Sequence, residues 1–327
     1  MEKKVIVGLD IGYSNLKIAI ETNGTERCIV LPAGAAPADR FGTRFDGSLN
    51  DEYINVLVNG EPYIAGVSPD KAALHTRELH DGYANSNSYK ALFHAALLLV
   101  EEDEIDILVT GLPVKQFNEE ERKTALENMM TGKHQVTPVR SVVVKKTIVI
   151  PQPIGGFLDY VNSENVDIDD SRILVIDPGF FSVDWVVIRD GNLQKQSSGT
   201  SLTASSVILE QCAISMARDY GAKVSIEVLE NAFRKGKKTI KILGKQVDFV
   251  SYLNDAIKTI VPSVLTSMQQ AIRNEYGEPD EILLVGGGAQ FFEQAVKTVF
   301  DRVNVKIPND AICSNARGFL VLAKAKS

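Results

Sequence analysis

The sequence contains few of the residues that build disulfides and metal sites, and no long hydrophobic run. Its three cysteines, Cys28, Cys212 and Cys313, lie far apart, so we expect neither a disulfide framework nor a CxxC metal pair. The four histidines show no metal-ligand spacing, and His94 lies in an apolar helical run that favours a packed core residue over a ligand. No apolar stretch reaches the ~18 residues that a membrane-spanning helix requires.

Positively charged residues are fewer than negatively charged ones. The chain has 35 lysines and arginines and 42 aspartates and glutamates, which gives a net charge of −7. This balance argues against nucleic acid as a primary partner of the chain as a whole. For the one basic run, RKGKKTIK at Arg234–Lys241, the alternatives are a local basic patch and a solvated hairpin, and the second is favoured. Asp10 interrupts the N-terminal apolar run and no cleavage site follows, so this segment is predicted to be a strand and not a signal peptide. We therefore expect a cytoplasmic protein without a membrane partner.

A chain of 327 residues exceeds what one hydrophobic core usually sustains, which favours two domains. An internal repetition supports this division. VIVGLDIGYSNLKIAI (Val5–Ile20) and ILVIDPGFFSVDWVVI (Ile173–Ile188) share one layout of an apolar run, an Asp-X-Gly turn and an alternating apolar strand. The duplication predicts two similar domains of α/β class. We expect domain I at residues 1–160 plus 310–327 with an insertion at about 31–87, and domain II at 165–309 with an insertion at about 203–280.

Between the two hairpins and after the second one, the pattern alternates between helices and strands. Helices are expected over residues 89–100, 119–130, 204–220, 226–234, 249–276 and 292–300, with another at the C-terminus. Pro262 is expected to kink the longest helix or to begin a new segment. The apolar run IDILVTGLP is typical of a strand covered on both faces of its sheet.

The two Asp-X-Gly turns have the composition of anion-binding turns. Glycine in a tight turn lets backbone N–H groups face an anion, and Lys17 adds a positive charge beside the first turn. A buried aspartate is costly unless it is paired, so Asp10 either caps its own turn or faces a cation or phosphate. Asp10 and Asp177, at equivalent strand ends, could hold Mg²⁺ through its waters. Further donors are Ser14, Asn15 and Ser182.

A third glycine segment, EILLVGGGAQ at Glu281–Gln290, connects a predicted buried strand to a helix. Three consecutive glycines leave room for a flat ring or a ribose against bare backbone, at the positive end of that helix. The ordinary alternative is a strand–helix connection with unusual backbone angles.

These three segments resemble the phosphate-1, phosphate-2 and adenosine motifs of the actin, Hsp70 and sugar-kinase ATPase superfamily. The motifs are DIGYSNLK (Asp10–Lys17), DPGFFSVDW (Asp177–Trp185) and LVGGGAQ (Leu284–Gln290). Within it the chain is most similar to the ParM/StbA plasmid-segregation actin-like proteins, also in TGLPVKQF, VIPQPIGGF and SSGTSL. The resemblance implies two duplicated actin-like (RNase H-like) domains around a nucleotide cleft, each with a smaller insertion.

The resemblance also implies ATP or ADP with Mg²⁺ as the bound cofactors. It assigns catalysis to Gln152, Asp10 and Asp177, with Gln152 orienting the attacking water, because phosphoryl transfer requires positioning and charge stabilisation above all. Turn filling between two prolines is the alternative role of Gln152. The implied nucleotide-binding residues are Asp10, Gly12, Tyr13, Ser14, Asn15, Lys17, Asp177, Gly179, Phe180, Ser182, Asp184, Gly286, Gly287, Gly288, Ala289 and Gln290.

The second turn departs from the superfamily pattern. Phe180 and Phe181 stand where a glycine and a hydroxyl donor are usual, which predicts a bulkier loop that donates fewer hydrogen bonds. Tyr13 likewise replaces a small residue in the first turn. These departures put the turnover rate in question more than nucleotide binding.

The function that the resemblance implies is a filament-forming ATPase that segregates plasmid DNA through a DNA-bound adaptor protein, without direct sequence-specific DNA binding of its own. The alternatives are a small-molecule kinase of the same fold and an ATP-binding scaffold that does not polymerise. A kinase would require a carboxylate base facing a polar substrate pocket, and no sugar-kinase signature is present.

Overall fold

The computed structural model describes residues 4–22, 24–41, 53–68, 71, 80–164, 166, 168–273, 275 and 277–327. The chain divides into two compact units, Met1–Asp169 with Pro308–Ser327 (unit 1) and Asp170–Ile307 (unit 2). Part of the insertion expected at residues 31–87 lies outside the described residues.

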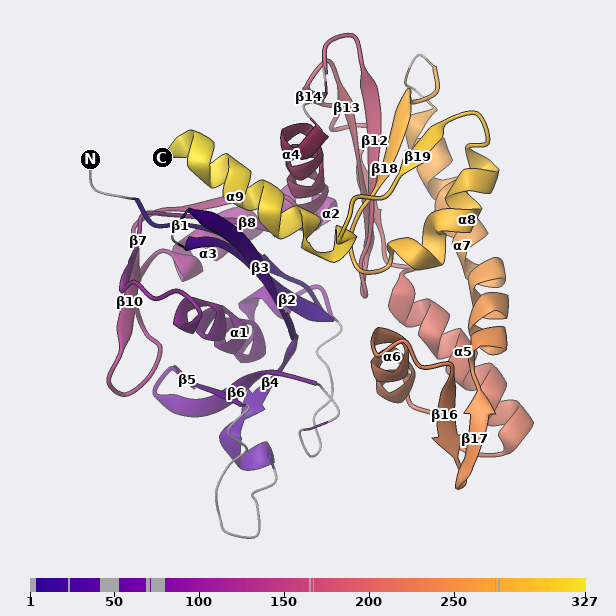
Figure 1. Cartoon of the computed structure of the whole chain (residues 1–327), viewed down its shortest axis with the longest axis horizontal. Coiled ribbons are helices and arrows are strands. Elements are labelled where there is room, and N and C mark those ends of the chain that lie inside the picture. Colours follow the sequence, from indigo (N-terminus) through magenta and orange to yellow (C-terminus); the bar gives the residue numbers. More distant parts are fainter. Residues whose placement is uncertain are drawn as a thin grey trace. The chain divides into compact units, whose positions relative to one another are not determined.

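Unit 1 is built on a five-stranded sheet with the order β11-β8-β1-β2-β3 (Figure 1). In this sheet β1 pairs antiparallel with β2 and parallel with β8, which in turn pairs parallel with β11. The strands are β1 (Ile6–Ile11), β2 (Asn15–Thr22), β3 (Thr25–Pro32), β8 (Ile107–Leu112) and β11 (Thr147–Pro151).

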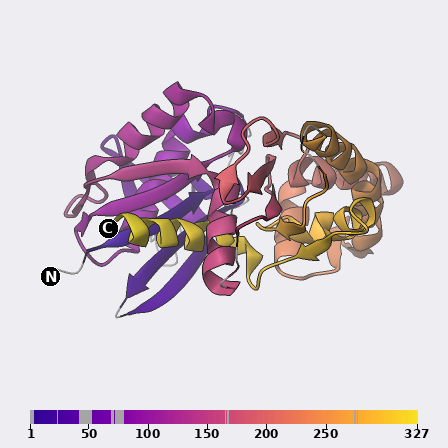
Figure 2. The same ribbon diagram turned by 90° about the horizontal axis from the view of Figure 1, so that it is seen from above.

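Helices cover both faces of this sheet, as the apolar run of β8 predicts. Ile107 and Val109 pack against α9 (Ser314–Lys326), while Leu108 belongs to the core that contains α1 (Asn87–Leu98). Figure 2 shows α9, the yellow helix that ends at the C-terminus, against the strands of the sheet. The buried His94 on α1 is a core residue, as predicted.

Two smaller sheets complete unit 1, with the orders β7-β10-β9 and β4-β6-β5. The helix α3 begins with Glu120 and Glu121, where the helix dipole favours negative charge. The remaining elements are β4 (Gly34–Pro37), η1 (Ala38–Arg40), β5 (Ile54–Val58), β6 (Glu61–Val67), η3 (Tyr83–Asn85), β7 (Glu104–Ile105), α2 (Val114–Phe117), α3 (Glu120–Met130), β9 (Gly132–Gln135), β10 (Ser141–Val144), α4 (Gln152–Glu164) and η4 (Ala311–Cys313).

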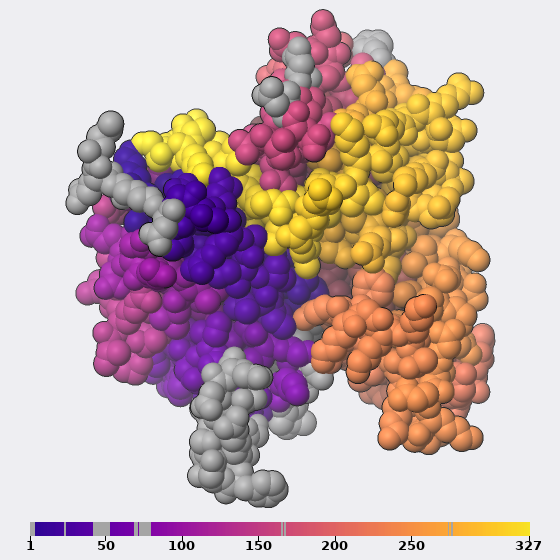
Figure 3. Space-filling view, in the orientation of Figure 1, coloured from indigo at the N-terminus to yellow at the C-terminus, as the bar shows by residue number. Residues whose placement is uncertain are grey.

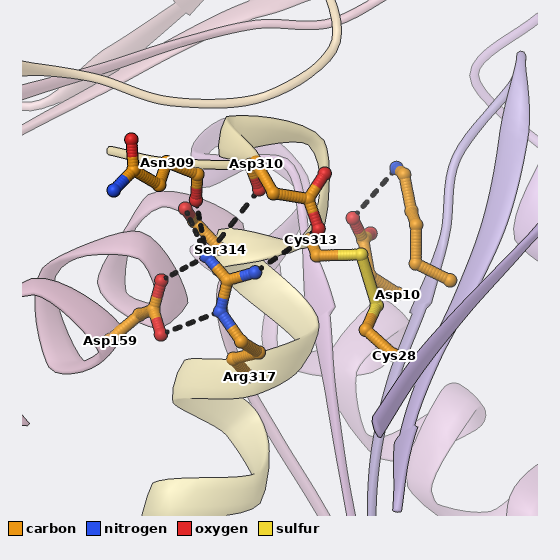
Figure 4. The surroundings of a disulfide bond; sticks show 9 residues. Asp10, Cys28, Asp159, Asn309, Asp310, Cys313, Ser314 and Arg317 are labelled. Atoms are coloured by element: carbon orange, nitrogen blue, oxygen red, sulfur yellow. Dashed lines mark hydrogen bonds and ion pairs between the residues drawn. A yellow bond between two sulfur atoms is a disulfide. The ribbon is translucent and has the colours of Figure 1, made fainter. Parts of the chain in front are cut away.

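The helices α4 and α9 cross in close contact. A Cβ atom added at Gly318 would lie 1.7 Å from the carbonyl oxygen of Gly155, so only glycine permits this approach. Beside the crossing, Arg317 donates from Nε and Nη2 to the two carboxylate oxygens of Asp159 at 2.9 and 2.8 Å (Figure 4). These hydrogen bonds raise the pKa of the Arg317 guanidinium.

The cysteine spacing predicted no disulfide framework, but the structure contains one disulfide that the sequence analysis did not expect. Cys28 on β3 and Cys313 at the start of α9 form a disulfide (Figure 4), although they lie 285 residues apart in sequence. The C-terminal helix folds back onto the first hairpin, which brings the two side chains together. The spacing of the cysteines in the sequence does not predict this packing of the C-terminal helix on the first hairpin.

Unit 2 repeats the arrangement of unit 1. Its central strand β12 pairs antiparallel with β13 and parallel with β18, and β18 pairs parallel with β19. The predicted duplication is therefore present as two sheets with the same hairpin and the same parallel neighbours. The strands are β12 (Arg172–Pro178), β13 (Val183–Arg189), β14 (Asn192–Leu193), β15 (Gly199–Ser201), β18 (Glu281–Leu284) and β19 (Asn304–Lys306).

The remaining elements of unit 2 are mostly helical. They are α5 (Ser205–Tyr220), α6 (Ile226–Arg234), the hairpin β16 (Thr239–Ile242) with β17 (Lys245–Asp248), α7 (Val250–Ile272) and α8 (Ala289–Val299).

The expectation that Pro262 would begin a new segment was wrong, because α7 continues through it as one helix. Pro262 lies on the exposed side of the helix. Proline has no N–H, so one backbone carbonyl in the preceding turn lacks its helical hydrogen-bond donor. Water can reach this carbonyl on the exposed side of the helix.

None of the helices formed by the described residues has both the length and the apolarity to cross a membrane.

Candidate functional site

The turn between β1 and β2 carries a buried carboxylate with a full set of partners. The N–H of Gly12 donates to the carbonyl oxygen of Asn15 at 2.9 Å and closes the turn. Asp10, only 2% exposed, accepts from Lys17 Nζ at 2.8 Å and from Gln152 Nε2 at 3.0 Å. Of the two explanations for this aspartate, the structure shows the facing cation, and Lys17 on the neighbouring strand supplies it.

Gln152 reaches Asp10 because the backbone of β8 leaves room for it. Gln152 is the first residue of α4, directly after the end of β11. A Cβ atom added at Gly111 on β8 would lie 2.8 Å from Gln152 Cγ and 2.6 Å from Phe319 Cζ. Gly111 is thus a positioning residue that the sequence analysis missed. A glycine inside a buried strand is the available signal, because it often marks a close approach.

The other residues of the first turn divide between packing and local hydrogen bonds. The Tyr13 ring stacks on Tyr83 with centroids 4.5 Å apart, and its hydroxyl donates to the carbonyl of His80 at 2.9 Å. The Asn15 amide donates to Ser14 Oγ at 3.2 Å. Tyr13 is therefore part of the turn, and its ring is fixed by packing against a neighbouring aromatic side chain.

The turn between β12 and β13 has the same backbone hydrogen bond. The N–H of Gly179 donates to the carbonyl of Ser182 at 2.8 Å, matching Gly12 and Asn15. Its charge differs, however, because Asp184 stands opposite Asp177, at the register position where Lys17 stands opposite Asp10. The second turn therefore carries two buried carboxylates, and it suits a hydrated cation better than an anion.

Hydroxyl groups stabilise the second of these carboxylates. Ser182 Oγ donates to Asp184 Oδ2 at 2.7 Å, and Thr200 Oγ1 donates to Asp184 Oδ1 at 2.5 Å. The predicted phosphate donor Ser182 thus has an acceptor within its own turn. Thr200, which the sequence analysis did not single out, lies in the SSGTSL segment and pairs through β15 with Asp184.

The glycine segment after β18 lies against the end of β12. The N–H of Gly288 donates to the carbonyl of Pro178 at 2.9 Å. A Cβ atom added at Gly286 would lie 2.0 Å from Asp177 Oδ1, and Gly286 has a φ of 79°, a conformation that favours glycine. The structure therefore brings the glycine segment and Asp177 together, and α8 begins directly afterwards at Ala289.

The start of α5 supports the second turn and adds a hydroxyl group. The N–H of Ser206 donates to the carbonyl of Phe180 at 2.9 Å, and the Phe180 side chain is buried. Ser205 Oγ is buried without a hydrogen-bond partner among the described residues, and a Cβ atom added at Gly288 would lie 2.7 Å from it. Ser205 is a candidate ligand contact that the sequence analysis missed, since TASS indicates only a helix start.

The donor set fits a magnesium ion that keeps its waters. Among the described residues, no group of three histidine, cysteine, aspartate or glutamate side chains is placed to hold a metal ion. Mg²⁺ commonly uses one or two carboxylates together with water and substrate phosphate. Unit 2 has one buried carboxylate of this kind in Asp177, and unit 1 has one in Asp10.

Family models match both units of the chain. Residues 8–155 match the N-terminal domain of actin-like proteins, and residues 175–298 match the C-terminal domain of archaeal MreB-like actin homologues. The chain is an actin-like protein. The resemblance noted in the sequence is thereby confirmed at the level of this family.

Solved structures support the same conclusion along the whole chain. A non-polymerisable quadruple mutant of pCBH ParM superimposes with a TM-score of 0.81 at 21% identity, covering 99% of this chain and 100% of that one. The archaeal actin homologue Ta0583 in complex with ADP gives 0.78 at 21%, covering 98% and 99%. A 15-stranded ParM filament from Clostridium botulinum gives 0.76 at 20%, covering 99% of both.

No curated protein matches this actin-like sequence. At the identities of the solved structures, the likeness establishes the fold, and the predicted two-domain actin-like fold is confirmed.

Proposed function

We propose that this actin-like protein is a magnesium-dependent ATPase whose nucleotide state controls its assembly into filaments. The observation that carries the proposal is the pair of matching turns, with the glycine segment pressed against the second. Both turns close with the same backbone hydrogen bond, and Gly286 has no space for a side chain beside Asp177. Such close approach of bare backbone to a carboxylate is typical of a site for a bound group.

The residues around each turn suit different parts of Mg-ATP. The first turn offers its backbone and Lys17 to phosphate oxygens, and the glycine segment 286–288 with Ala289 and Gln290 offers a surface to adenosine. Asp10 and Asp177 would hold the waters of Mg²⁺. When bound, the ion neutralises charge on the phosphates during transfer.

Gln152 is placed to orient a water molecule. Its amide nitrogen is committed to Asp10, and its amide oxygen accepts no hydrogen bond from any described residue. A fixed side chain with an available acceptor can direct the proton of an attacking water without removing it. This geometry favours positioning over the turn-filling alternative.

Filament formation is supported by the likeness to solved ParM structures, one of which is a filament. By analogy with the ParM/StbA proteins, we propose that the filaments segregate plasmid DNA and that a DNA-bound adaptor protein attaches the plasmid. The net charge of −7 agrees with an adaptor rather than direct DNA binding.

Light scattering with electron microscopy tests the proposal. We expect scattering to rise on addition of Mg-ATP or a non-hydrolysable analogue, to decay as ATP is consumed, and to stay flat with ATP and a chelator. The Gly286→Ala variant should not respond, because its new methyl group would overlap Asp177. ATP binding with a flat trace in all conditions would contradict polymerisation, and sugar-stimulated ADP release would favour the kinase alternative.

A plasmid-retention assay tests the finer role. A low-copy plasmid that carries this gene with its flanking DNA should be inherited stably and should be lost on substitution of Asp177→Ala. Unchanged inheritance with the inactive variant would refute plasmid segregation while leaving nucleotide-dependent polymerisation standing.

A further inference from the structure

Unit 2 contains a hollow that is separate from the residues assigned to the nucleotide. It lies between α6 and the β16–β17 hairpin and has a volume of about 380 Å³. Figure 1 shows these elements at the end of unit 2 away from β12 and β18, and Figure 3 shows their orange atoms at the surface. The hollow falls in the size range of ligand-binding clefts.

The rim of the hollow carries positive charge that the chain does not neutralise. Lys235, Lys237 and Lys241 line it and are exposed, and none forms an ion pair with a described residue. By contrast, Arg234 at the end of α6 pairs with Glu230 at 2.9 Å. Six lysines and arginines and no acidic residue lie in Arg234–Lys245, within a chain that is otherwise strongly acidic.

The rest of the lining is apolar or neutral. Val228, Ala232 and Ile240 contribute hydrocarbon surface, while Asn231 and Gln246 contribute amide groups. Among the described residues, no aromatic side chain lines the hollow. The surface therefore combines a cationic rim with a small apolar floor and groups that can hydrogen-bond a peptide backbone.

We propose that this hollow binds an acidic peptide segment of a partner protein, with an apolar side chain between its carboxylates. The carboxylates would face the three lysines, and the apolar side chain would cover Val228 and Ile240. Single-stranded nucleic acid fits less well, because its bases require aromatic stacking partners.

The basic run thus has a third interpretation beyond a solvated hairpin and a general basic patch. Its lysines border a hollow with a defined floor, instead of projecting from an isolated hairpin. The proposal does not depend on ATP hydrolysis or filament formation, since it uses no residue of the two turns or of the glycine segment.

Fluorescence anisotropy with a labelled EELEE peptide tests the inference on the full chain. We expect binding at ~0.05 M NaCl that weakens strongly at ~0.3 M, because exposed charges are screened by salt. The Lys235→Glu/Lys241→Glu double variant should bind at least ~10-fold more weakly, a loss of about 1.4 kcal/mol. Lys195→Glu, an exposed lysine elsewhere in unit 2, is the matched control and should bind like the wild type.

Two further measurements test the contribution of the apolar floor and the folding of the double variant. An EESEE peptide should bind more weakly than EELEE, because it cannot cover the apolar floor. Thermal melting should show that the double variant remains folded, since both lysines are exposed.

Several results would overturn the proposal. They are failure of EELEE to bind, equal loss in the Lys195→Glu control, equal binding of EESEE, and tighter binding of an oligonucleotide than of the peptide. Self-association that the double variant abolishes would assign the hollow to a second copy of the chain and would likewise overturn the assignment to a partner.

Discussion

At the residue scale, one register position distinguishes the two repeated turns. Lys17 faces Asp10 in the first turn, whereas Asp184 faces Asp177 in the second. The two turns therefore have the same backbone pairing, but the residue opposite the aspartate is positively charged in the first turn and negatively charged in the second. The two turns therefore differ in the charge that each presents beside its buried aspartate.

Asp177→Ala should abolish magnesium-dependent phosphate release while leaving the chain folded. The change removes a carboxylate that would hold metal-bound water, and it removes little core volume. We expect at least a ~100-fold fall, the scale of losing a key electrostatic group in an active site. Phosphate release is the measurement, and Asp255→Ala, which replaces an exposed aspartate inside α7, is the control. Hydrolysis at the wild-type rate would refute the assignment of Asp177.

Gln152→Ala should slow hydrolysis and prolong any polymer without weakening ATP binding. The variant loses the group that orients water but keeps both turns. We expect kcat to fall by about 10- to 100-fold, the range for lost positioning. Single-turnover hydrolysis and nucleotide titration separate the two effects. A shorter-lived polymer, or equal losses in binding and rate, would contradict the positioning role.

The buried His94 should make the stability of the protein depend on pH. Burial lowers its pKa from 6.5 to about 4, and its Nδ1 donates to the Leu57 carbonyl at 2.5 Å. The unfolded chain therefore binds a proton between these values while the folded chain does not. The stabilisation is complete above pH 6.5 and is lost as pH falls towards 4, by at most about 3 kcal/mol.

Urea denaturation across this range measures the effect. His94→Gln should flatten the dependence, and a slope equal to that of the wild type would assign it to other groups. Burial also lowers the pKa of His134, which should leave a smaller slope of the same sign in the variant.

At the scale of elements, α9 joins distant parts of unit 1. Its Gly318 approaches the backbone of α4, its Arg317 pairs with Asp159, and the disulfide at its start reaches β3. The last helix of the sequence thus covers the first hairpin of the sequence. We expect the position of this helix to control the stability of the first turn.

Cys28→Ser should destabilise the oxidised protein by about 2–4 kcal/mol, because the lost cross-link closes a long loop in the unfolded chain. Urea denaturation with and without reductant measures the change. Cys212→Ala is the control, because Cys212 is a free buried thiol whose pKa burial raises to about 11. Equal stability of wild type and Cys28→Ser without reductant would show that the disulfide contributes nothing.

At the scale of the whole molecule, the two units have the same order of strands in their main sheets.

Mass action predicts that bound Mg-ATP raises the free energy of unfolding of this protein by about 2.7 kcal/mol at 100 times its Kd. For units of this size that corresponds to a rise in Tm of roughly 5–10 °C. Thermal scans of the wild type and Gly286→Ala measure the shift, which the variant should lose. A full shift in Gly286→Ala would exclude the glycine segment from the site.

Much of the fold could be predicted from local pattern. The two hairpins, the glycine turn before α8 and the main helices follow from periodicity and from glycine at turns, which act over a few residues. The continuation of α7 through Pro262 could not be predicted, because it depends on which side of the helix faces solvent. The role of Gly111 depends likewise on the neighbours of β8.

The sequence by itself determined the repeat, the two Asp-X-Gly turns and the glycine segment, because each is a short-range pattern of apolar and turn-forming residues. Only the tertiary structure decided that Gln152 contacts Asp10 across 142 positions and that Cys28 meets Cys313 across 285. It also decided that the lysines that follow α6 and the lysine on β16 border one hollow. Such contacts arise from the packing of helices on sheets, which no local spacing encodes.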